Sequence, residues 1–221
     1  MGKTLDTILT RRIIAELRNV PPGQAIAVVW ALADGGVTCM EVTIDARAEA
    51  GLEDALQTIT LLKNEFGDSI TLGAGDVLSP DQVQAVVLEG AAFIVSPGVD
   101  RDVIRKTKSL GLVSIPGAIT PTEIVNASAW GADIIRLFPV SFLNVEYIHA
   151  LKAPLGHIPL FAGGGVSLRN ARRLLDAGCA GISAGGLLVE HNLVEAKDYF
   201  AIRKRAKEFV MALVNDPPVY P

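Results

Sequence analysis

The chain has 221 residues, 50% of them apolar, and this length is enough for one hydrophobic core. The formal net charge is −4 and no dense run of Lys or Arg is present, which argues against a nucleic-acid partner. The N-terminus lacks the apolar core of a signal peptide, and no apolar stretch is long enough to span a membrane. We therefore expect a cytoplasmic protein without a membrane partner, folded as one domain over residues 1–221 with a short N-terminal helical segment.

Short apolar runs alternate with longer amphipathic segments along the whole chain, a pattern typical of βα units on a parallel sheet. About eight such units are present, and this number favours a closed (β/α)₈ TIM barrel over an open doubly wound sheet. The strands are predicted at 13–17, 39–43, 70–72, 93–95, 112–115, 134–138, 158–161 and 181–184. Most of these runs are apolar throughout, as strands buried on both faces require.

Helices are predicted between the strands, at 23–32, 52–64, 80–88, 103–110, 121–129, 168–177 and 194–214. Ser79 and Thr120 each precede a proline, so each is expected to cap the helix that follows. Glycines at 90, 111, 131 and 178 are expected to end helices in the left-handed conformation.

In a barrel of this kind the active site lies at the carboxyl ends of the strands. Two glycine-rich turns follow the last two predicted strands, one at 163–165 and one at 185–186. Glycine backbones can bring N–H groups close to an anion, and these two loops hold phosphate in many such barrels. Either turn alone is more simply a tight turn, but together they favour an anion site.

Three carboxylates are expected at the same mouth, because Glu41 and Asp45 surround one strand end and Asp76 follows the next strand. Such a cluster would shift the pKa of its members for proton transfer, or bind Mg²⁺ or Mn²⁺. The alternative is that Asp45 and Asp76 cap helices or pair with a neighbour such as Arg47. An acid at position 41, inside the run CMEVTI, is costly to bury unless it is paired or functional.

Arg18 and Arg136 lie at the ends of apolar runs, where a guanidinium group can bind a carboxylate or phosphate. A structural ion pair with one of the acids is the alternative for each. Ser96 has no histidine in a matching position, which argues against a hydrolase nucleophile.

An ordered series of motifs resembles the 2-keto-3-deoxy-6-phosphogluconate and 4-hydroxy-2-oxoglutarate (KDPG/KHG) aldolases and their phosphogalactonate relatives. The motifs are LRN at 17–19, GGVTCMEVTI at 35–44, LGAGDVLSPDQ at 72–82, FIVSPGVD at 93–100, IPGAITPTE at 115–123, IIRLFP at 134–139, AGGGV at 162–166 and SAGGLL at 183–188. The resemblance implies a homotrimeric barrel that cleaves a 2-keto-3-deoxy sugar acid to pyruvate and an aldehyde, through a Schiff base on lysine.

By the same resemblance, Glu41 matches the general acid/base, and Arg18 matches an arginine found in part of the family. The pyruvate pocket is matched by Pro97, Phe138 and Pro139, and the phosphate loops by Gly164, Gly165, Gly185 and Gly186.

The chain departs from the family pattern at positions that carry out the reaction in the family. The Schiff-base lysine is expected two residues before Phe138, where this chain has Arg136, and a guanidinium group cannot act as an amine nucleophile at neutral pH. Asp76 replaces a threonine of the pattern, and Asp45 replaces an arginine.

Three functions remain open from the sequence. The first is an aldehyde-lyase acting on a 2-keto acid, in which a divalent metal on Glu41, Asp45 and Asp76 polarises the keto oxygen and an arginine stabilises the enolate. The second is other enolate chemistry, decarboxylation or epimerisation. The third is an anion-binding protein without catalysis.

Overall fold

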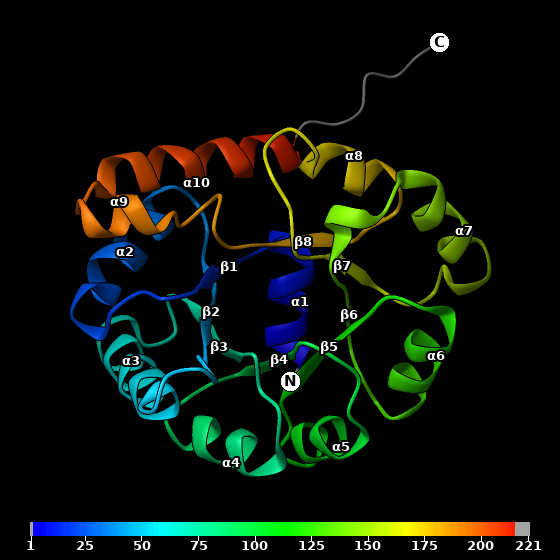
Figure 1. Ribbon diagram of the computed structural model, residues 1–221, viewed down its shortest axis with the longest axis horizontal. Helices are drawn as coiled ribbons and strands as arrows, with labels where there is room; N and C mark the ends of the chain where they lie inside the picture. The colour runs from blue at the N-terminus through cyan, green and yellow to red at the C-terminus, as the bar shows by residue number, and fades with distance from the viewer. Residues whose placement is uncertain (1, 215–221) are drawn as a thin grey trace.

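The computed structural model describes residues 2–214 and shows a closed barrel of eight parallel strands in chain order, β1 to β8. Helices surround the barrel as an outer ring (Figure 1). The predicted (β/α)₈ fold is therefore confirmed. None of the helices described is long and apolar enough to cross a membrane.

The strands are short and almost fully buried. They run over β1 (Ile13–Leu17), β2 (Cys39–Thr43), β3 (Thr71–Gly75), β4 (Phe93–Ser96), β5 (Val113–Ala118), β6 (Ile135–Leu137), β7 (Leu160–Ala162) and β8 (Gly181–Ala184). The first, second and eighth have the predicted bounds, and the others differ by a few residues. Pairing of β1 with β8 closes the ring, with Ile14 opposite Ser183.

The helices mostly follow the amphipathic segments seen in the sequence. They are α1 (Gly2–Arg11), α2 (Pro22–Asp34), α3 (Gly51–Phe66), α4 (Pro80–Leu88), α5 (Arg101–Ser109), α6 (Pro121–Ala129), α7 (Val145–Leu155), α8 (Ala171–Asp176), α9 (His191–Glu195) and α10 (Tyr199–Val214), with a 3₁₀ turn, η1 (Val140–Phe142). Ser79 and Thr120 cap α4 and α6 as predicted, Thr120 in a reciprocal capping box with Glu123. The four helix-ending glycines all have positive φ.

One helical prediction was wrong, and one helix was not predicted. The stretch 194–214 is not one helix, because the chain breaks between α9 and α10 at Lys197, whose φ is 54°. Helix α7 was not predicted from the sequence, and it contains Pro154 near its end. Proline normally argues against a helix interior, because it lacks the backbone N–H and its ring crowds the preceding turn.

The barrel interior has an apolar layer beneath a charged one. Ile14, Cys39 and Ile134 belong to the apolar inner cluster, with Phe93 and Phe161. Because side chains two residues apart on a strand share a face, the next inward positions on β1, β2 and β6 are Glu16, Glu41 and Arg136. In the same cluster Ile8 of α1 is fully buried, so α1 closes the end of the barrel away from these charges.

Candidate active site

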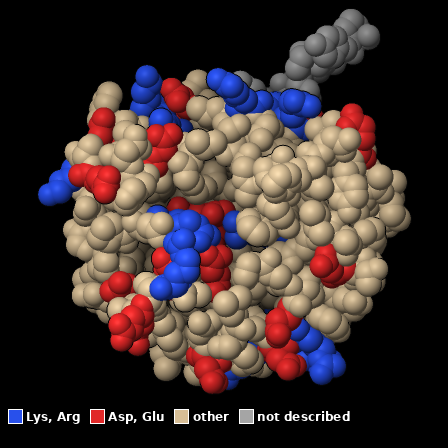
Figure 2. Space-filling view, in the orientation of Figure 1, with Lys and Arg blue, Asp and Glu red and all other residues tan. Residues whose placement is uncertain are grey.

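A cavity of about 750 Å³ opens at the carboxyl ends of the strands. Positive and negative side chains gather at this central hollow (Figure 2). Its polar lining includes Arg18, Asp45, Asp76 and Arg136, together with Glu16 and Ser183. The other lining residues are Ile44, Ala46, Arg47, Leu78, Pro97, Phe138, Gly164, Gly165, Val166, Gly185, Gly186 and Leu187. The cavity therefore lies where the sequence predicted the site, and it contains most of the predicted residues.

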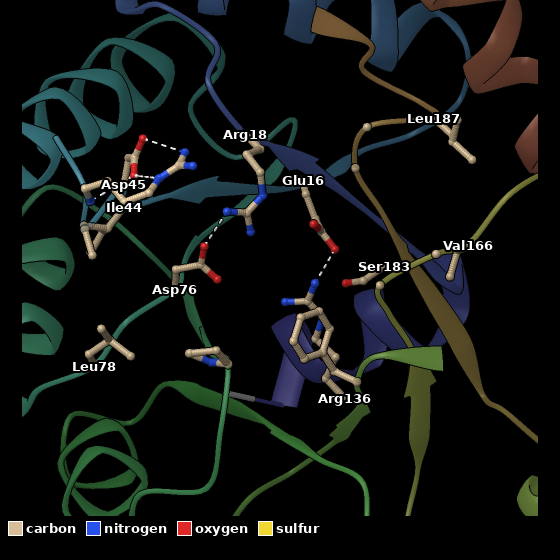
Figure 3. A pocket seen from close by; sticks show the side chains of 18 residues that line it. Glu16, Arg18, Ile44, Asp45, Asp76, Leu78, Arg136, Val166, Ser183 and Leu187 are labelled. Carbon is tan, nitrogen blue, oxygen red and sulfur yellow. Dashed lines mark hydrogen bonds and ion pairs between the residues drawn. The ribbon is translucent and has the colours of Figure 1, made fainter. Parts of the chain in front are cut away.

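The floor of the cavity is an ion pair between Glu16 and Arg136. Arg136 Nη2 donates to Glu16 Oε1 at 2.5 Å, and the two side chains are 2% and 8% exposed (Figure 3). Arg136 Nη1 also lies 3.8 Å from Glu41 Oε1, and the guanidinium carbon lies 4.7 Å from the centre of the Phe138 ring. A buried guanidinium group requires such partners, because an uncompensated charge in the interior is very costly.

Three glycines make room for this charged floor. A Cβ atom added at Gly163 would overlap Arg136 Nε, and one at Gly75 would overlap the Glu41 carboxyl group. At Gly185, the added atom would lie 2.8 Å from Glu16 Oε2. The absence of side chains at these positions is therefore a packing requirement of the buried charges.

Glu41 lies beneath the cavity. Its side chain is fully buried, and it is not among the described residues that line the cavity. Neither carboxyl oxygen has a hydrogen-bond partner among residues 2–214. Burial raises the pKa of Glu41 to about 8, against the lowering effect of Arg136 and with smaller raising effects from Glu16 and Asp76. Glu41 is thus mostly protonated at neutral pH.

Arg18 and Asp76 form a second ion pair at the mouth of the cavity. Arg18 follows β1, Asp76 follows β3, and Arg18 Nη1 lies 2.7 Å from Asp76 Oδ2 (Figure 3). Asp76 has a φ of 55°, a conformation that non-glycine residues adopt rarely and that Asp tolerates better than most. The structure therefore shows an ion pair for Arg18, which was the alternative expected from the sequence.

The three carboxylates that the sequence placed together are not arranged as one metal site. Asp45 is held by Arg47, whose Nε and backbone N–H both donate to Asp45 Oδ1, and this lowers the pKa of Asp45. Asp76 pairs with Arg18, and Glu41 lies near Arg136. Within residues 2–214, no group of three or more His, Cys, Asp or Glu is placed to hold a metal ion. An arginine lies near each of the three acids instead, so the single carboxylate cluster expected from the sequence is not formed among the described residues.

Apart from Gly163, whose N–H donates to the carbonyl group of Leu137, the glycines of the two turns keep their N–H groups available. No hydrogen bond between described residues uses the backbone N–H of Gly164, Gly165, Gly185 or Gly186. The carbonyl groups of Gly164 and Gly165 accept from Ser141 N and Asn170 Nδ2, which fixes this turn from behind. Phe138 lines the cavity, whereas Pro139 packs behind it, close to Gly164. Unused N–H groups beside a cavity suit an anionic ligand.

Glu16 is a charged lining residue that was not predicted from the sequence, although a signal for it existed. Glu16 lies inside the apolar run IIAEL as Glu41 lies inside CMEVTI, and an acid in such a run needs a partner or a function. Among the described residues that line the cavity none is a lysine. Lys63, Lys108 and Lys152 bind other parts of the chain on the outer ring.

Comparison with known proteins places the chain among aldolases. The sequence model of the KDPG and KHG aldolase family matches residues 6–205, a range that includes every residue lining the cavity. The chain belongs to the KDPG and KHG aldolase family.

Two curated members of this family are similar to the chain over most of their length. A 2-dehydro-3-deoxy-6-phosphogalactonate aldolase of Escherichia coli K12 is 37% identical over 174 residues, covering 78% of this chain and 82% of that protein. A probable 2-dehydro-3-deoxy-6-phosphogalactonate aldolase of Rhizobium meliloti is 35% identical and covers 81% of each chain. A solved structure described as native KDPGal superposes with a TM-score of 0.82 at 35% identity, covering 91% of this chain and 93% of that one. Family members of this kind are lyases, and the chain shares their barrel.

Proposed function

We propose that this family member is an aldehyde-lyase that cleaves a 2-keto-3-deoxy acid, phosphorylated or of the 4-hydroxy-2-oxoglutarate type, without a lysine Schiff base. The family supports carbon–carbon cleavage, and the similar proteins named above act on phosphorylated 2-keto-3-deoxy sugar acids. The products would be pyruvate or a related keto acid and an aldehyde.

One observation carries the departure from Schiff-base chemistry. The basic side chain at the cavity floor is Arg136, and none of the lining residues described is a lysine. Because a guanidinium group stays protonated, it cannot attack a ketone as an amine does. It can stabilise negative charge that develops on the keto oxygen as the enolate forms.

In this proposal, different residues of the cavity bind different parts of the substrate. Arg136 receives the keto acid end at the cavity floor, next to Pro97 and Phe138. The other end of the substrate, which carries the phosphate or second carboxylate, binds the N–H groups of the two glycine-rich turns. These are the N–H groups of Gly164, Gly165, Gly185 and Gly186, and Arg18 lies at the mouth of the same cavity. The carboxyl groups of Glu16 and Glu41 both lie near Arg136, and only Glu16 lines the cavity.

A pyruvate-release assay over a panel of 2-keto-3-deoxy acids, with and without phosphate, tests the proposal. We expect release from at least one member, and no covalent product when borohydride is added with pyruvate. A borohydride-trapped adduct on the native protein would disprove the arginine mechanism. Catalysis without aldehyde formation would instead support decarboxylation or epimerisation, and thermal stabilisation by a keto acid without turnover would support a binding protein.

Two further expectations from the sequence, metal assistance and a homotrimer, need separate experiments. The same assay with EDTA, and with added Mg²⁺ or Mn²⁺, tests the use of a metal, and the ion pairs of Asp45 and Asp76 lead us to expect no effect. The homotrimer implied by the resemblance is tested by light scattering on the purified protein.

A further inference from the structure

We propose that Glu16 is the carboxylate that transfers the substrate proton in this protein, and that Glu41 acts on it only from beneath, as a positioning residue. This inference rests on the proposed lyase function. It assigns a role to a side chain that the motifs of the sequence did not single out.

Position distinguishes the two carboxyl groups. Glu16 lines the cavity and Glu41 does not, although they lie opposite each other on neighbouring strands β1 and β2. Glu41 is 0% exposed and lies beneath the floor, so a bound substrate meets Glu16 and Arg136 first. A group that exchanges a proton with a substrate has to come within hydrogen-bond distance of it.

The surroundings of Glu16 also fit a proton-transfer group. One oxygen, Oε1, is held by Arg136, and the other, Oε2, is turned to the space left by Gly185. Gly185 and Gly186 line the same cavity, so Oε2 lies beside the turn expected to bind the anion. The carboxylate is thus fixed by one oxygen while the other stays next to the space for substrate.

Glu41 fits the positioning role because it competes for the same guanidinium group. Arg136 Nη1 lies 3.8 Å from Glu41 Oε1, whereas Nη2 lies 2.5 Å from Glu16. Glu16 is therefore the nearer partner of Arg136 in the structure, and Glu41 is the more distant one. Ionisation of Glu41 would draw Arg136 away from Glu16.

Glu16 alone can accept and return the proton that the cleavage requires. The Glu16 carboxylate accepts the proton of the C4 hydroxyl group, the C3–C4 bond breaks, and its electron pair forms the C2–C3 enolate while C4 becomes the aldehyde carbonyl. Arg136 stabilises the enolate oxygen. After the aldehyde leaves, the protonated Glu16 returns the same proton to C3, which gives the keto acid and restores the carboxylate.

Matched glutamine variants of the full-length protein test the assignment, with Glu53 on the exposed face of α3 as the control. We expect Glu16→Gln to lower kcat at least about 100-fold with little change in KM, since general acid–base catalysis contributes about that much or more. Glu41→Gln resembles the neutral form of Glu41 and should keep kcat within about tenfold at neutral pH, well short of that loss. Glu53→Gln should behave as the native protein.

Two additional measurements separate chemistry from folding. Formate added to Glu16→Ala should restore part of the cleavage, because the truncated side chain leaves space for a small carboxylate. Exchange of the pyruvate methyl hydrogens with deuterated solvent, followed by NMR, reports the formation and reprotonation of the enolate without carbon–carbon cleavage. This exchange should be lost in Glu16→Gln. Loss of activity in Glu41→Gln with retention in Glu16→Gln would overturn the assignment. A native protein that neither cleaves the panel nor exchanges pyruvate would refute the proposed function itself.

Discussion

Gly185 leaves the space in which Oε2 of Glu16 lies, because a Cβ atom at this position would come within 2.8 Å of it. Gly185→Ala should therefore displace Glu16 from its place above Arg136. We expect kcat to fall at least about tenfold, more than KM rises, and stability to fall by about 1–3 kcal/mol, as is typical of overpacked sites. Steady-state kinetics and urea denaturation measure the two effects.

The control for this variant is Gly23→Ala in α2, where an added Cβ atom meets nothing within 4 Å. Alanine favours a helix over glycine, so this variant should match or slightly exceed the native stability. A Gly185→Ala protein with native kcat would show that the position of Glu16 is unimportant.

The raised pKa of Glu41 predicts a specific dependence of stability on pH. The native protein keeps this proton up to about pH 8, whereas the unfolded chain releases it near the ordinary value of 4.5. Because the native state binds more protons, Glu41 makes the protein less stable as pH rises through this window, by up to about 1.4 kcal/mol per pH unit. Glu41→Gln cannot ionise, so its stability relative to the native protein should increase with pH.

Urea denaturation of both proteins at about pH 5.5 and about pH 7.5 measures this difference. The charged groups around Glu41 are Arg136, Glu16, Asp76 and Arg18, and all four are present in both proteins. A difference that stays constant with pH would mean that Glu41 is ionised in the native protein.

Arg136→Lys introduces an amine at the cavity floor. A lysine there can form an imine with pyruvate when it loses its proton, which the guanidinium group cannot do. We expect mass spectrometry after borohydride reduction to detect a pyruvate adduct on Arg136→Lys and none on the native protein. Arg172→Lys on α8, whose partner is Asp176, is the control and should remain unlabelled.

The ion pair between Arg18 and Asp76 predicts how tightly an anionic substrate binds. Asp76→Asn keeps a residue that tolerates positive φ but removes the charge that neutralises Arg18. KM for an anionic substrate should fall about fivefold at low salt, in line with about 1 kcal/mol for a partly exposed pair, and this gain should shrink as salt is added. Asp68→Asn, which breaks the distant pair with Lys63, should leave KM unchanged, and a higher KM in Asp76→Asn would contradict the prediction.

The fold was predictable because its signals are local. Apolar runs separated by amphipathic segments mark βα units, and Ser79 and Thr120 mark helix starts through short-range hydrogen bonds. Helix α7 was not predicted. It contains Pro154 in its last turn, and the rule that proline interrupts helices argues against a helix there.

From the sequence, the site could be predicted only as a group of residues at the carboxyl ends of the strands, without their contacts. Arg136 and Glu16 are 120 residues apart and meet across the barrel, and their contact depends on strand register and closure, which the sequence pattern does not specify. For the same reason, the separation of Glu41, Asp45 and Asp76 among three arginines was not visible from their spacing.

The ion pair between Glu16 and Arg136 also limits the order in which this chain can change over evolution. Loss of Glu16 alone would leave the buried guanidinium group without its nearest partner, and loss of Arg136 alone would strand a buried carboxylate, each at a cost of about 3–5 kcal/mol. For a domain with a typical stability of about 5–15 kcal/mol, such a single step threatens folding. The two positions are therefore expected to vary together among related sequences, so that an arginine at 136 accompanies an acid at 16.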